Sequence, residues 1–192
     1  MCIRDRHENS TIESIVIENG VATGVQTQDG FQAADILILA AGCWSAQIEG
    51  LPETLRPPVR PVKGQMLAFQ MEAGITVKNV IRTVRARYPM SVYLVPRTDG
   101  RLIVGATSEE MGFDTRLTGG GVFELLRGAW EAVPSIYELP LLETWTGLRP
   151  GSRDNAPILG ETPIENLIYA TGHYRNGILL TPITAYEIAK LF

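Results

Sequence analysis

The sequence predicts an α/β chain that combines part of a parallel sheet with an antiparallel sheet and a packed helix. The first observation is ADILILAAG at residues 34–42, a near-continuous apolar run typical of a parallel strand buried on both faces. The second is a region between residues 64 and 106 in which extended segments alternate with short turns, the pattern of antiparallel pairing. Because the two patterns occupy different stretches, we expect two structural regions.

Composition indicates a folded protein and excludes several classes. The chain has 192 residues, 45% of them hydrophobic and 20% charged, which suits one large or two small domains. Its 17 basic and 21 acidic residues give a net charge of −4, so we expect no nucleic acid partner. No apolar run approaches the roughly 18 residues of a membrane span. With two cysteines and two histidines, and no zinc-like spacing, we expect no metal site and a reducing, cytoplasmic setting.

The elements before residue 50 are a tail, a hairpin and the apolar strand. Residues 1–6 show no hydrophobic period, and we interpret them as a non-native tail on a chain that is itself a fragment. Residues 14–18 and 21–27 flank Asn19-Gly20, a pair that favours a tight hairpin turn. The apolar run that follows ends in small residues, which let a flat ligand approach the backbone.

The middle of the chain predicts a linker, an antiparallel sheet and a helix. Prolines at residues 51–61 indicate a linker between domains. Helical spacing of apolar residues predicts an amphipathic helix over residues 121–133 that packs on the sheet. The extended segments expected here are residues 64–71, 80–86, 91–95, 101–106 and 141–145.

The stretch ATGHYRNGILLTP at residues 170–182 lies between a predicted strand at 167–169 and a predicted helix at 182–192. It is made largely of small and polar residues. A strand that turns into a helix in this way exposes backbone N–H groups to an anionic or electron-rich ligand. We therefore expect a ligand-binding turn here.

Five blocks, ILILAAGCWS, RPVKGQ, YLVPRTDGRLIVGATSE, WTGLRPGSRDNAPILG and ATGHYRNGILLTP, carry a resemblance in this order. They resemble the C-terminal half of the D-amino-acid oxidase family of flavoproteins, and most of all the glycine oxidases of thiamine biosynthesis. The resemblance covers residues 14–192 and lacks the family's GxGxxG unit, which holds the FAD pyrophosphate. It implies a partial FAD-binding domain at residues 7–50 and 146–192, and a substrate-binding antiparallel-sheet domain at residues 57–145.

The resemblance also implies which residues face the FAD. The turn that starts at Gly172 would lie over the flavin ring, with N–H groups of the following helix toward the pyrimidine carbonyl. For His173, a packed or capping role is an equal alternative to a flavin hydrogen bond. The expected cofactor-binding residues are Ala41, Gly42, Trp44, Gly172, His173, Arg175, Asn176, Gly177, Ile178 and Leu179, with Ala40 in the same cluster.

The expected substrate-binding residues are Arg149, Tyr93, Arg175 and Ser108. Arg149 would hold a substrate carboxylate through two parallel hydrogen bonds, and the alternative is a surface arginine in a turn. Tyr93 would place a hydroxyl near the same carboxylate, unless it is only a half-buried sheet tyrosine. A small Ser108 would widen the pocket.

A further group, Arg60, Lys63 and Gln65, lies where family members bring the substrate domain beside the flavin. For Arg60 and Lys63 we favour the alternative of solvated surface charges.

The activity implied is oxidative deamination of glycine or another small D- or N-methyl amino acid. FAD would accept hydride from the substrate, no side chain would act as catalytic base, and oxygen would reoxidise the flavin to give hydrogen peroxide. The partners expected are the amino acid and oxygen, with a homo-oligomer as a further expectation for the full-length parent. Two alternatives stay open: another FAD-dependent oxidoreductase, either a dehydrogenase or a tRNA-modifying oxidase module, and an inactive fragment.

Overall fold

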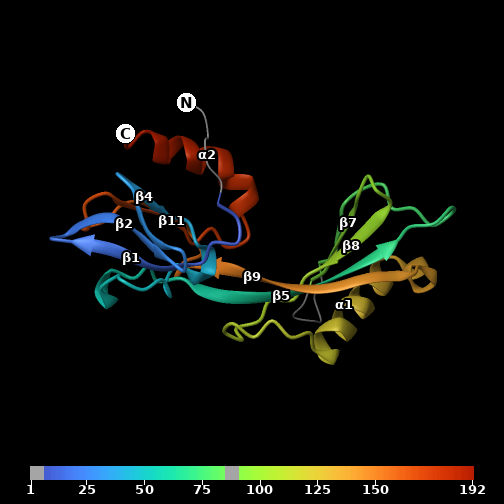
Figure 1. Cartoon of the computed structure of the whole chain (residues 1–192). Coiled ribbons are helices and arrows are strands. Elements are labelled where there is room, and N and C mark those ends of the chain that lie inside the picture. The colour runs from blue at the N-terminus through green and yellow to red at the C-terminus, as the bar shows by residue number, and fades with distance from the viewer. Residues whose placement is uncertain (1–6, 85–90) are drawn as a thin grey trace. The chain divides into compact units, whose positions relative to one another are not determined.

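The computed structural model describes residues 7–84 and 91–192, which divide into two compact units (Figure 1). One unit contains the chain up to Arg60 together with Arg149–Phe192, and the other is Pro61–Leu148. The expected tail at residues 1–6 and the end of the expected strand at 80–86 lie outside the described residues. In the described ranges no helix is both long and apolar enough to cross a membrane.

The first unit begins with a three-stranded antiparallel sheet of β1 (Ile12–Glu18), β2 (Val21–Thr27) and β3 (Gly30–Ala33). The hairpin expected at Asn19-Gly20 is confirmed. Both turn residues have positive φ, 52° for Asn19 and 86° for Gly20, which is the backbone geometry that Asn-Gly favours.

The second sheet of this unit has the order β10-β11-β4, with β4 at Leu37–Leu39, β10 at Ile158–Glu161 and β11 at Leu167–Thr171. β4 and β11 are parallel, whereas β10 and β11 are antiparallel. The expectation of a strand buried on both faces over residues 34–42 is wrong. Only three residues form the strand, and Ile36 and Ile38 are 41% and 48% exposed. Leu37 and Leu39 pack on the core from one face of β4, whereas Ile38 on the other face is exposed.

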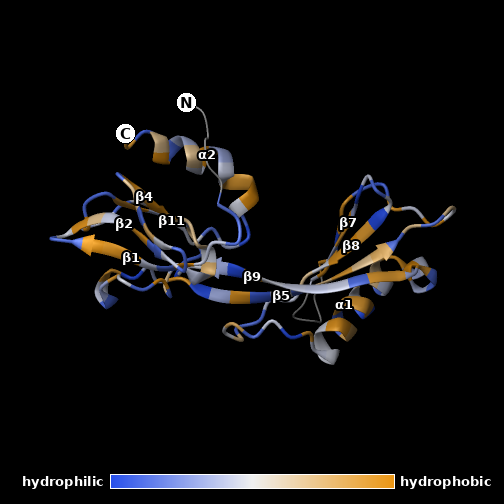
Figure 2. Ribbon diagram, in the orientation of Figure 1, coloured by the Kyte–Doolittle hydropathy of each residue, from blue (hydrophilic) through white to orange (hydrophobic). Residues whose placement is uncertain are grey.

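Two 3₁₀ turns, at Gly42–Trp44 and Glu53–Leu55, and the helix α2 (Gly177–Ala189) complete the unit. α2 starts five residues before the helix expected from Pro182, so Pro182 lies inside it. Pro182 has no N–H and so leaves one backbone hydrogen bond of the helix unmade. The residues on either side of it are nevertheless helical. α2 contacts β10. Figure 2 shows hydrophobic residues alternating with more polar ones along α2.

The second unit contains a five-stranded sheet in the order β6-β7-β8-β5-β9. β8 pairs antiparallel with both β5 and β7, and β7 with β6, as expected. β9 is longer than expected because it continues from residue 141 through Gly151, into the first unit. The bounds are β5 (Arg60–Gln70), β6 (Ile81–Arg82), β7 (Tyr93–Pro96), β8 (Arg101–Gly105) and β9 (Leu141–Gly151).

The expected amphipathic helix is α1 (Gly119–Ala132), which a 3₁₀ turn at Pro134–Glu138 follows. Thr118 caps its start by accepting a hydrogen bond from the Gly121 N–H at 3.1 Å. Leu125 and Ala129 bury one helix face against a core formed with the sheet. The sheet residues of this core are Leu67, Phe69, Val92, Leu94, Leu102 and Val104.

Candidate functional site

Two glycine turns in the first unit are held side by side. The parallel register pairs Leu167 with Leu37 and Tyr169 with Leu39, so β4 and β11 end at the same edge of the sheet. The buried hydroxyl of Thr171, at the end of β11, accepts from Ser45 Oγ at 2.9 Å and donates to the Gly42 carbonyl at 3.0 Å. The structure therefore brings together the two turns that sequence reasoning assigned to the cofactor.

Replacing Thr171 with valine should destabilise this edge of the sheet. Valine keeps the shape but leaves the buried Ser45 Oγ without its acceptor, and the Gly42 carbonyl keeps only its bond from the Ser45 N–H, a loss of about 1–3 kcal/mol in the free energy of unfolding. Urea unfolding monitored by tryptophan fluorescence would measure it. Thr181→Val, at an exposed position of α2 where the hydroxyl bonds only the Gly177 carbonyl, is the matched control and should cost less. Equal losses in the two variants would contradict this role for Thr171.

The turn after β11 leads into an open helix start. Gly172 has a φ of 76°, and an added Cβ there would lie 3.2 Å from Ile158 Cγ1, so a glycine suits the position on both counts. The Asn176 N–H donates to the His173 carbonyl at 3.0 Å, and the first helical bond runs from the Leu180 N–H to the Asn176 carbonyl. Three N–H groups precede that bond, those of Gly177, Ile178 and Leu179.

The Asn176 side chain makes no capping hydrogen bond to this helix start. Ile178 and Leu179 are 93% and 78% exposed. Uncapped N–H groups at the positive end of a helix suit an anionic or electron-rich ligand. Exposed apolar side chains around them suit a flat ring.

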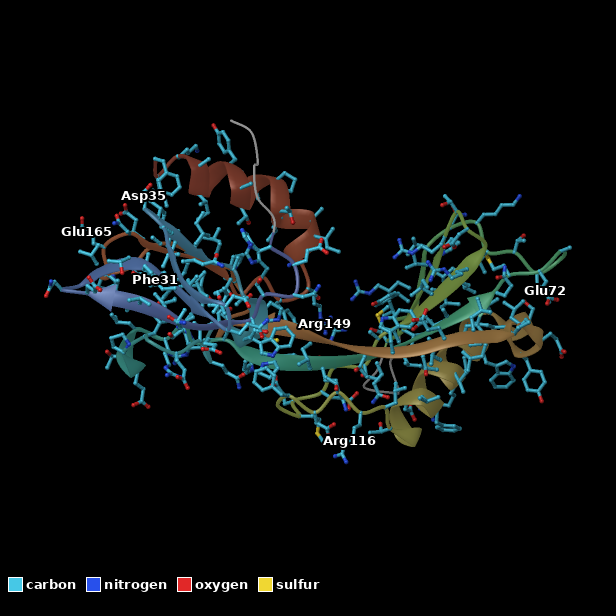
Figure 3. All side chains as sticks on the ribbon, viewed as in Figure 1. Phe31, Asp35, Glu72, Arg116, Arg149 and Glu165 are labelled. Carbon is cyan, nitrogen blue, oxygen red and sulfur yellow. The ribbon has the colours of Figure 1, made fainter. Side chains whose placement is uncertain are left out.

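Arg149 is tied to this same turn through the backbone. Residues Pro150 and Gly151 end β9; the Pro150 carbonyl accepts from the Tyr174 N–H at 2.9 Å, and Gly151 forms a β-bridge with His173. Arg149 itself is half-buried (Figure 3). The predicted carboxylate clamp and the predicted flavin turn are therefore neighbours, although more than twenty residues of sequence separate them.

The loop that follows Arg149 is fixed by hydrogen bonds of its own. Buried Ser152 donates to the Ala156 carbonyl at 2.7 Å, and Asp154 accepts from the Ala156 N–H at 3.0 Å. Arg60 Nη1 donates to the Ser152 carbonyl at 2.5 Å. These hydrogen bonds fix the backbone of residues 152–156, which follow Arg149 in the chain.

The other side chains expected near the cofactor occupy varied environments. His173 Nε2 lies 2.9 Å from Thr184 Oγ1 of α2, and burial holds the pKa of the imidazole below its ordinary value, so it is neutral at neutral pH. Arg175 is exposed, with its guanidinium 5.0 Å from the Tyr174 ring centre. Trp44 is exposed and Ala41 half-buried beside Gly42.

The residues expected in the substrate domain belong to the second unit. Tyr93 is half-buried on β7, directly opposite Gly105 of β8, and Ser108 is exposed just after β8. Tyr93 is thus a half-buried tyrosine of a sheet. The roles of Tyr93 and Ser108 toward a substrate stay predictions.

The expectation that Lys63 is a solvated surface charge is wrong. Its side chain is 0% exposed, and its ammonium group lies 3.1 Å from Glu109 Oε2 and donates to the Arg116 carbonyl at 3.1 Å. Gln65 is also buried, where it donates to Glu109 Oε1 at 2.8 Å and to Thr118 Oγ1 at 2.9 Å. Only Arg60 of this group is exposed.

Sequence reasoning missed the hydroxyl pair of Ser45 and Thr171, and the partner of Lys63, which is Glu109. The signal for the pair was weak but present: each small polar residue directly adjoins one of the two glycine turns. No comparable signal marked Glu109, because its partners come from segments distant in the sequence. Across the described ranges no group of three metal-ligating side chains occurs.

The fold and the site define a class of protein. Parallel strands that end in glycine turns, followed by an uncapped helix start, are an arrangement that α/β proteins use to bind cofactors, and an arginine next to it suits an anionic substrate. Residues 5–191 match the FAD dependent oxidoreductase family, and the chain belongs to that family.

Relatives within the family include oxidases of amino acids. The chain is 41% identical over 181 residues to the bifunctional protein ThiO/ThiG of Nostoc sp., covering 94% of this chain and 26% of that protein. It is 39% identical over 187 residues to the glycine oxidase of Pseudomonas putida, covering 96% of this chain and 48% of the relative. The crystal structure of glycine oxidase from Bacillus cereus superposes with a TM-score of 0.84 at 32% identity, over 96% of this chain and 50% of that one. The chain thus spans about half the length of the glycine oxidases it matches.

Proposed function

We propose that this chain supplies the substrate side, and part of the FAD site, of an oxidase that deaminates glycine or another small D- or N-methyl amino acid. The products are a 2-oxo acid, hydrogen peroxide and ammonia, or methylamine in place of ammonia from an N-methyl amino acid, and the resemblance to glycine oxidases of thiamine biosynthesis supports a role in that pathway. The observation that carries the proposal is the backbone link between the end of β9 after Arg149 and the turn after Gly172, because arginine is a residue type that binds carboxylates and this turn is the one expected over the flavin.

The residues present fit FAD. Gly42 and Gly172 have positive φ and open the backbone at the sheet edge, and the uncapped start of α2 offers N–H groups to a negative ring. When bound, FAD supplies the hydride acceptor of the reaction. The chain's own part is to hold the ring against this edge and to stabilise negative charge on it through the helix start.

Substrate orientation falls to a few side chains. Arg149 binds the substrate carboxylate through two charge-assisted hydrogen bonds, and Tyr93 is a further substrate-binding residue through its hydroxyl. Arg175 adds positive charge at the entrance, and Ser108 leaves room in the pocket. His173 supports the turn through its contact with Thr184.

The proposal is tested by a substrate panel. A flavin-loaded protein that contains this chain is assayed for hydrogen peroxide with glycine, N-methylglycine and D-alanine, and with glycerol phosphate as a substrate that has no carboxylate. We expect peroxide with at least one amino acid and none with glycerol phosphate. Oxidation of glycerol phosphate alone would overturn the amino-acid assignment. Flavin reduction by an amino acid without peroxide would indicate a dehydrogenase instead.

A further inference from the structure

A row of residues crosses the sheet of the second unit on the face that points away from α1. The cross-strand register places Met66 of β5 opposite Gly105 of β8, and Gly105 opposite Tyr93 of β7. Directly opposite residues share a face of a sheet. The next row along the strands, which includes Leu94 and Val104, belongs to the core under α1, so the row with Tyr93 lies on the other face.

The Tyr93 ring occupies the space that a side chain at Gly105 would fill. A Cβ built on Gly105 would lie 2.5 Å from both Cζ and Oη of Tyr93 and 2.8 Å from Cε2. Such distances are far inside van der Waals contact, so the ring lies directly on the glycine backbone. Any larger residue at this position would displace it.

The φ of Gly105 lies outside the left-handed region, so a positive φ is not the reason for a glycine here. Glycine inside a strand weakens it, and one use of such a residue is to let another group approach closely. At Gly105 that group is the phenol ring of Tyr93.

The Tyr93 hydroxyl remains available to a ligand. Within residues 7–84 and 91–192, no group makes a hydrogen bond with it, and it is not a buried unpaired atom. The hydroxyl end of this phenol lies against Gly105, and no residue in the described ranges hydrogen-bonds it, so it can donate to and accept from a bound molecule.

We propose that Gly105 is a positioning residue that sets the place of the Tyr93 hydroxyl on the face of this sheet that points away from α1. That this hydroxyl then meets a substrate carboxylate rests on the function proposed above. Gly105 acts only through the ring and touches neither substrate nor cofactor.

The test combines Gly105→Ala with Tyr93→Phe in a flavin-loaded protein that contains this chain. The crystal structure of Gly105→Ala should show the Tyr93 ring displaced from β8, and an unmoved ring would overturn the inference. Binding of a small carboxylate inhibitor, followed through the flavin spectrum, should weaken by about tenfold to a hundredfold, as expected for one lost hydrogen bond to a charged group. In a protein that already carries Tyr93→Phe, Gly105→Ala should weaken inhibitor binding little further, because the hydroxyl that Gly105 positions is already absent.

Two controls keep the outcomes distinct. Gly147→Ala, in β9 with nothing within 4 Å of the added Cβ, should leave inhibitor binding unchanged. If Gly105→Ala does not fold, adding Tyr93→Ala should restore folding, because it removes the clash; failure of that rescue would overturn the inference. A displaced ring with unchanged inhibitor binding, in both Gly105→Ala and Tyr93→Phe, supports the positioning role and removes Tyr93 from the proposed substrate site.

Discussion

Replacing Arg149 with alanine should weaken binding of a carboxylate inhibitor while FAD stays bound. Removing one partner of a hydrogen-bonded charge pair costs roughly 2–5 kcal/mol. This corresponds to about 30-fold to several thousand-fold in the dissociation constant. Arg149 should affect substrate binding and not FAD binding. The features expected to contact the flavin are the two glycine turns, which Thr171 and Ser45 hold together, and the start of α2.

The dissociation constant of the inhibitor would be measured from its perturbation of the flavin spectrum. Arg149→Lys should recover only part of the affinity, because an ammonium cannot form the two parallel bonds of a guanidinium. Arg153→Ala is the matched control: it removes an exposed arginine from the same loop and should change little. If Arg149→Ala bound FAD and inhibitor as well as the wild type, the carboxylate clamp would be wrong.

The second large effect is expected at the buried ion pair of Lys63 and Glu109. Glu109→Gln should lower the free energy of unfolding by about 3–5 kcal/mol, because it removes the carboxylate that pairs with the fully buried ammonium group. The loss should extend beyond the pair itself. Glu109 also accepts from Gln65 and Thr107, and Gln65 holds the α1 cap Thr118, so one carboxylate joins β5, the segment after β8 and the start of α1.

The pH dependence gives this prediction a second readout. Burial alone would raise the pKa of Glu109, but hydrogen bonds from Thr107, Gln65 and Lys63, with the charge of Lys63, outweigh it and hold the pKa below its ordinary value. A carboxyl with a lowered folded-state pKa contributes stability above its unfolded pKa and loses it as pH falls through the folded pKa. The difference between wild type and Glu109→Gln should therefore be largest near neutral pH and shrink below about pH 4.

Urea unfolding at several pH values would measure both effects. Glu187→Gln, which breaks an exposed pair with Lys190 at the end of α2, is the control and should cost far less. A Glu109→Gln protein as stable as the wild type at neutral pH would contradict the role given to the pair.

What could be read from the sequence followed from local patterns. The Asn-Gly hairpin, the helix that begins just after Thr118 and the antiparallel strands each have a signature within a few residues, and each is confirmed. The turn at Gly172 was also recognisable, because a strand, a run of small and polar residues and a helix occur in direct succession.

What could not be read depends on contacts between distant segments. An apolar run does not tell how many of its faces are covered, so the exposure of Ile38 was missed. RPVKGQ looks like a polar strand start, and only the partner segment around Glu109 makes Lys63 a buried residue. The place of Arg149 beside Tyr174 likewise depends on a backbone bond from β9 to a turn more than twenty residues later.

The most direct test of the central claim is reduction of bound FAD by an amino acid without oxygen. A flavin-loaded protein that contains this chain would be mixed anaerobically with glycine and its small relatives while the flavin absorbance is followed. We predict that the oxidised flavin band bleaches with wild type, bleaches only at much higher amino-acid concentration with Arg149→Ala, and returns on admission of oxygen with formation of hydrogen peroxide. A flavin that stays oxidised with every amino acid in the panel, and is reduced by a substrate without a carboxylate, would contradict the account.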